Sequence, residues 1–177
     1  SDGDLSIIRY PGAHPQPMKE TIAAYLRYAA SRLHPLGVRV SADVFGLSAT
    51  RDLGIGQFPA QIGKVVDTIY PMTYPSHYTP GEFNLPNPNA APHATVADSL
   101  RDFRAQLDGE RAAVVPWLQD FSLGRTYSAA DVAAQIAAAR EAVTGGFMLW
   151  NAAGVYTAQE LRHGTPPPLP ELPTPGL

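Results

Sequence analysis

Two aspartates stand near the ends of apolar, β-branched segments of the chain. Asp43 lies in the segment 38–47 and Asp120 in the segment 112–121. Hydrolysis of a glycosidic bond needs two carboxyl groups, one that protonates the leaving oxygen and one that acts as nucleophile or base. We therefore take Asp43 and Asp120 as the candidate catalytic residues. The alternative for Asp43 is a structural ion pair in the interior.

Aromatic and hydrogen-bonding side chains gather at the same segment ends. Tyrosine and tryptophan rings offer flat apolar faces with a polar edge, which suit the C–H faces of sugar rings, while amide and imidazole groups bind hydroxyls. These side chains therefore predict a carbohydrate ligand. The alternative for the aromatic residues is a place in the core. The candidate substrate-binding residues are Tyr70, Tyr74, His77, Trp117, Gln119, Trp150 and Asn151.

Composition argues against several other classes of function. The five histidines show no pair at metal-ligand spacing and the chain has no cysteine, so we expect no metal site and no other cofactor. A net charge of −3 without a basic stripe argues against nucleic acid as a partner. No apolar run approaches the roughly 18 residues of a membrane span.

Apolar segments that predict strands alternate with amphipathic segments that predict helices. The predicted strands span 38–47, 65–74, 112–121 and 146–151. The predicted helices span 18–34, 96–107 and 129–143, with a short helix within 56–64 and a last one from Thr157. Thr95 and Ser128 are the expected N-caps. This alternation favours a parallel sheet with right-handed crossovers, whose ligands bind at the C-terminal ends of the strands.

The twofold period of a strand indicates which side chains share a face. Asp43 alternates with Val44, so in a barrel we expect Asp43 to face the interior. If Trp117 and Gln119 also face inward, Asp120 points to the helix layer or to a loop.

Four strands fit either a small doubly wound domain or half of a (β/α)8 barrel, which takes about 250 residues when whole. The segment 54–57 lacks the third glycine of a dinucleotide-binding loop, which disfavours the first alternative. We expect one domain over 1–164. The segment 165–177 holds six of the 18 prolines, which predicts a linker or an extended tail.

Four motifs carry a resemblance to a known family, namely those at 41–46, 70–78, 116–121 and 146–152. In this order they resemble a bacterial family of uncharacterised domains called putative glycoside hydrolases. The resemblance implies a (β/α)8 barrel whose strands five to eight lie in this chain, and an extracellular or cell-envelope location.

The family's fourth strand carries an Asp-Tyr-(Val/Ile)-Arg-(Phe/Tyr)-Pro motif, whose aspartate is the expected nucleophile or base. Arg9-Tyr10-Pro11 echoes only the end of that motif, without its Asp-Tyr pair. We therefore expect a piece of a longer glycoside hydrolase that is inactive alone. Its expected partners are carbohydrate and either the N-terminal half-barrel of the parent chain or a second copy. The alternative is a non-catalytic carbohydrate-binding barrel of the cell envelope.

Overall fold

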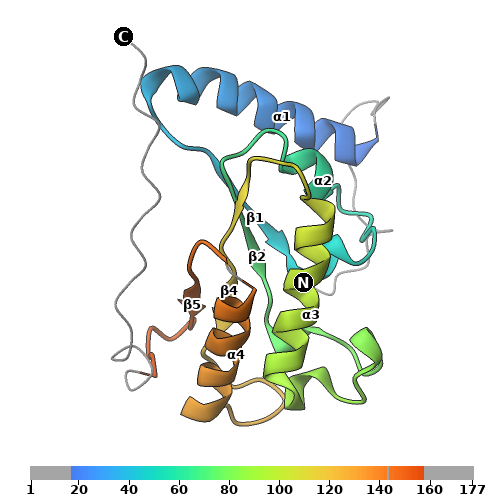
Figure 1. Ribbon diagram of the computed structural model, residues 1–177, viewed down its shortest axis with the longest axis vertical. Helices are drawn as coiled ribbons and strands as arrows, with labels where there is room; N and C mark the ends of the chain where they lie inside the picture. Colours follow the sequence, from blue (N-terminus) through green and yellow to red (C-terminus); the bar gives the residue numbers. More distant parts are fainter. Residues whose placement is uncertain (1–16, 143, 158–177) are drawn as a thin grey trace.

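Parallel strands alternate with helices in the computed structural model, which describes residues 17–142 and 144–157 (Figure 1). A 3-10 turn or loop follows most strands. The helices and strands in chain order are α1 (Met18–Leu33), β1 (Ser41–Phe45), α2 (Pro59–Ile62), β2 (Thr68–Met72), α3 (Pro92–Gln106), β3 (Ala113–Val114), β4 (Trp117–Gln119), α4 (Ala129–Glu141) and β5 (Met148–Trp150).

The strands form one parallel sheet in the order β1-β2-β4-β5, with β3 also paired to β2. β3 and β4 together are the predicted strand 112–121. Pro116 interrupts it because proline has no amide hydrogen for the ladder. The strand order follows the chain order and never reverses, whereas a doubly wound sheet reverses at its switch point. This excludes the doubly wound alternative for the described residues.

One face of the sheet packs on the helices. Two apolar clusters fill this layer, one joining Val44 of β1 and Ile69 of β2 to α1, α2 and α3. The other joins Leu118 of β4 to α3 and α4, which lie side by side (Figure 1). Side chains such as Phe103 and Leu118 are 0% exposed. Each contributes about 1.5–3 kcal/mol by burial.

The opposite face, here called the open face, carries the alternate strand residues. It is defined by Asp43, Phe45, Tyr70, Met72, Trp117 and Trp150. Phe45 is 36% exposed and Trp150 is 43% exposed, so no described helix covers this face. A sheet wound in one direction with helices on one face only is the arrangement of part of a (β/α)8 barrel, as expected from the sequence.

The start of α3 differs from the prediction because a proline precedes the expected N-cap. The helix expected at 96–107 begins at Pro92, because proline suits the first helical position. Thr95 is therefore not an N-cap, and its hydroxyl donates to the carbonyls of Pro88 and Ala91. The Ser128 capping box with Asp131 is confirmed. The helix predicted from Thr157 and the proline-rich segment 165–177 lie outside the described residues, among which no helix is long and apolar enough to span a membrane.

Candidate functional site

The Asp43 carboxylate lies on the open face in contact with a tryptophan. The indole Nε1 of Trp117 donates a 2.8 Å hydrogen bond to Asp43 Oδ1. Trp117 also packs edge-to-face on Trp150, with ring centroids 5.9 Å apart and an interplanar angle of 82°. Residue Asp43 is exposed, so the structure leaves it accessible beside the Trp117 ring. The twofold strand period predicts the shared face of Asp43 and Trp117 but not this contact.

A second aromatic group stands where β2 ends. Tyr74 meets His77 and Phe121 in edge-to-face contacts at 5.4 Å and 5.5 Å. Tyr74 is 8% exposed. Burial, and then the negative charge of Asp43, raise the pKa of the Tyr74 hydroxyl above its usual range, so this phenol stays neutral and lies near Asp43. His77 is exposed at the rim, with its Nδ1 3.1 Å from the Ser76 hydroxyl.

Gln119 is brought to the strand ends but is 0% exposed. Its amide accepts from the Ser76 backbone N–H at 3.1 Å and donates to the Phe121 carbonyl at 2.8 Å. The backbone of Gln119 is bonded in both directions to the side chain of Gln135, also 0% exposed. The Gln119 amide therefore holds two loops together and faces no solvent.

Asp120 is 5% exposed, and its carboxylate binds Thr157. Its two oxygens accept from the Thr157 backbone N–H at 2.7 Å and from the Thr157 hydroxyl at 2.6 Å. Asn151 donates to the Asp120 carbonyl and accepts from the Ala153 backbone N–H at 2.8 Å. Both side chains thus tie the segment after β5 to the end of β4.

Two open-face residues were missed by the sequence reasoning. Phe45 and Met72 stand in register with one another on β1 and β2, two positions after Asp43 and Tyr70. The same twofold period that placed Asp43 would have found them. Together with Tyr74 and His77 they line a cavity of about 110 Å³ at the strand ends, closed by Leu53 and Tyr78.

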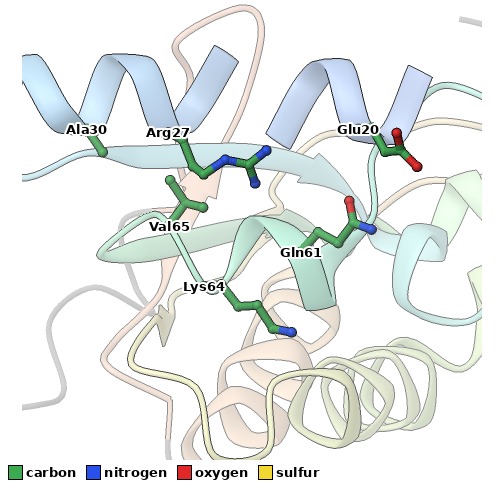
Figure 2. A pocket seen from close by; sticks show the side chains of 6 residues that line it. All are labelled: Glu20, Arg27, Ala30, Gln61, Lys64 and Val65. Carbon is green, nitrogen blue, oxygen red and sulfur yellow. The ribbon is translucent and has the colours of Figure 1, made fainter. Parts of the chain in front are cut away.

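A larger hollow lies elsewhere, between the outer helices α1 and α2 (Figure 2). It is an open groove of about 630 Å³ with Arg27 and Gln61 on facing helices and Val65 on its floor. It lies in the helix layer and shares no residue with the strand-end cluster. No group of three metal-ligating side chains occurs within 17–142 and 144–157.

Comparisons with known proteins identify structural neighbours and a family. No curated protein matches the sequence. The solved glycoside hydrolase domain of PgaB (BpsB) from Bordetella bronchiseptica is 14% identical with a TM-score of 0.48, over 78% of this chain. This chain spans 40% of that one. The sequence profile of a family described as "Putative glycosyl hydrolase domain" matches residues 1–156, and the chain therefore belongs to that family.

Proposed function

We propose that this chain acts on or binds a carbohydrate at the C-terminal ends of its strands, as part of a glycoside hydrolase barrel. One observation carries the proposal: the Asp43 residue is exposed on the open face and accepts a hydrogen bond from Trp117, whose ring in turn packs on the exposed Trp150. A sugar ring stacked on an indole presents its hydroxyls and glycosidic oxygen at the ring edge. An acid beside that ring is placed to exchange a proton with such an oxygen.

The candidate residues then divide into two groups by accessibility. Asp43 is proposed as the catalytic acid or base, and Tyr70, His77 and Trp150 as the residues that contact sugar. Tyr74, Trp117, Gln119, Asp120 and Asn151 are proposed to support them, since their polar atoms are buried or bonded to the protein. For Asp120 this replaces the catalytic role, because both of its oxygens are used by Thr157.

A glycosidase needs a second carboxyl group. Near the strand ends of the described residues, Asp120 binds Thr157 and Glu82 pairs with Arg51. We propose that the second acid comes from the strands that complete the barrel, in the same parent chain or in a second copy. Among residues 17–142 and 144–157, the open face is exposed and the outer edges of β1 and β5 have no paired strand. Both facts support this proposal, because a barrel pairs both edges. Residues 1–164 would form the barrel part and 165–177 a linker.

Hydrolysis of a polysaccharide panel by the full-length protein tests the proposal. Asp43→Asn removes the acid and keeps the shape, so we expect a loss of activity of at least about a hundredfold, the range typical of a general acid or base. The matched control is Asp108→Asn, an exposed aspartate after α3 at the opposite end of the sheet, which keeps wild-type activity. Equal activity of the two variants would remove Asp43 from the mechanism.

A non-catalytic carbohydrate-binding barrel of the cell envelope is the second candidate. The single accessible carboxylate among the described open-face residues favours it, because binding needs no acid pair. This function predicts glycan binding that survives Asp43→Asn and drops on Trp150→Ala. Tyr28→Ala is the control, since Tyr28 is 66% exposed on α1 in the helix layer. A glycan array without any bound sugar would contradict both candidates.

A further inference from the structure

We infer that Trp117 is a positioning residue that holds the carboxylate of Asp43 in one orientation. Its catalytic consequence rests on the proposed function, whereas the contact itself can be tested without any substrate. The inference assigns to Trp117 a role through its indole N–H, distinct from the stacking role that an aromatic ring at a sugar site would have.

The chemistry of the indole fixes the donor and the acceptor of the bond between Trp117 and Asp43. An indole N–H can only donate, so Asp43 Oδ1 is the acceptor of the 2.8 Å bond. Within the described residues no hydrogen bond engages Asp43 Oδ2. One oxygen is therefore held by the protein, and the other is presented to the open face. An exposed aspartate without such a bond would sample several side-chain rotamers.

The bond spans a strand. Asp43 on β1 is in register with Tyr70 of β2, while Trp117 on β4 is in register with Met72 of β2. The two residues thus stand on either side of β2 with an offset of two residues along the strands, which corresponds to a Cα separation of about 12 Å in a flat sheet with strands about 4.8 Å apart and about 3.3 Å per residue. The long indole of Trp117 bridges this separation, so the bond depends on how β1, β2 and β4 are paired.

Trp150 restricts the indole from its other side. Its ring meets Trp117 edge-to-face, so rotating the Trp117 ring away from Asp43 would break this contact. The nearby Tyr74 hydroxyl stays neutral, so it adds no second charge beside Asp43. Trp117 therefore supplies the directional hydrogen bond that orients the Asp43 carboxylate, and Trp150 supports it by packing.

Indole N–H resonances in a proton–nitrogen NMR spectrum of the chain test the contact. The chain has only two tryptophans, Trp117 and Trp150, so the second is an internal reference. Trp117→Phe removes one signal and assigns it. At neutral pH, Asp43→Asn exchanges an anionic acceptor for a neutral one and is expected to move the Trp117 signal more than that of Trp150.

Asp108→Asn, which changes a distant carboxyl, is the matched control and is expected to leave both indole signals in place. A Trp117 signal that is indifferent to Asp43→Asn would overturn the inference.

Kinetics of the full-length protein then separate positioning from sugar contact. Trp117→Phe keeps an aromatic ring and loses the N–H, so kcat is expected to fall about ten- to a hundredfold, as for a misplaced catalytic group, with KM nearly unchanged. A raised KM with unchanged kcat would make Trp117 a substrate contact and overturn the positioning role. A wild-type protein without hydrolytic activity would count against the proposed function alone, because the NMR result decides the contact independently.

Discussion

Replacement of Gln119 by leucine is the sharpest test of how the loops at the strand ends are held. Gln119 is 0% exposed, and its amide accepts from the Ser76 N–H and donates to the Phe121 carbonyl. Leucine has a similar volume and fits the same space, but it can make neither bond. Gln119→Leu therefore removes the link between the loop after β2 and the loop after β4 while leaving the packing nearly intact.

The expected cost follows from these two bonds. Each neutral hydrogen bond contributes about 1 kcal/mol net, and a buried group left without a partner costs about 1–3 kcal/mol. Ser76 is only half-buried, so water can replace part of its loss. The free energy of unfolding is expected to fall by about 2–4 kcal/mol. The bonds between the Gln135 side chain and the Gln119 backbone remain, since they do not involve the replaced amide.

Equilibrium unfolding in urea, followed by circular dichroism, measures this loss. The matched control is Gln61→Leu on α2, because the half-buried Gln61 lines the outer groove and its side chain makes no hydrogen bond within the described residues. Its effect should stay within about 0.5 kcal/mol. A loss below that size for Gln119→Leu, combined with weakened glycan binding, would refute the supporting role and make Gln119 a sugar contact.

Two further predictions concern the helix cap and the turn after β1. The pKa of Asp131 is lowered to about 2, mainly by the hydrogen bond from the Arg125 guanidinium and then by hydrogen bonds from Ser128. Burial acts in the opposite direction but is outweighed. This depressed pKa contributes up to about 2 kcal/mol that is present above about pH 4 and lost as the pH falls toward 2. Asp131→Asn should therefore flatten the acid limb of the stability profile, and Asp108→Asn should not. Gly46→Ala would place a Cβ in steric conflict with the Tyr78 hydroxyl oxygen. The variant should therefore lower the free energy of unfolding by about 1–3 kcal/mol or displace that ring, as measured by urea unfolding and by the Tyr78 NMR signals.

The elements could be predicted because their signals are local. The apolar period placed α1 and α4 within two residues of their observed ends, and the Ser128 capping box marks the start of α4. The lengths of the strands were overestimated, because apolar residues continue beyond the hydrogen-bonded part of each strand. The split at Pro116 was foreseeable from proline chemistry, whereas the early start of α3 required weighing Pro92 against Thr95.

The candidate site could be predicted in part. The face of the sheet on which Asp43 and Trp117 lie follows from the twofold strand period. Whether a polar side chain at a strand end stays free depends on what the following loops bring to it. In the sequence, Asp120 and Gln119 look equivalent to other polar strand-end residues. In the structure, the Asp120 carboxylate is hydrogen-bonded to Thr157, and the Gln119 amide is hydrogen-bonded to the backbone of Ser76 and Phe121.

Periodicity and motif order were enough to predict the alternation of strand and helix, the face on which Asp43 stands and the resemblance to the family, because these signals can be read along the chain. The accessibility of the candidate residues could not be read from the chain, because it depends on which loops pack against each strand end. The contact of the Trp117 indole with Asp43 across β2 could not be read either. That contact joins residues 74 positions apart, and it depends on the strand pairing of the folded sheet.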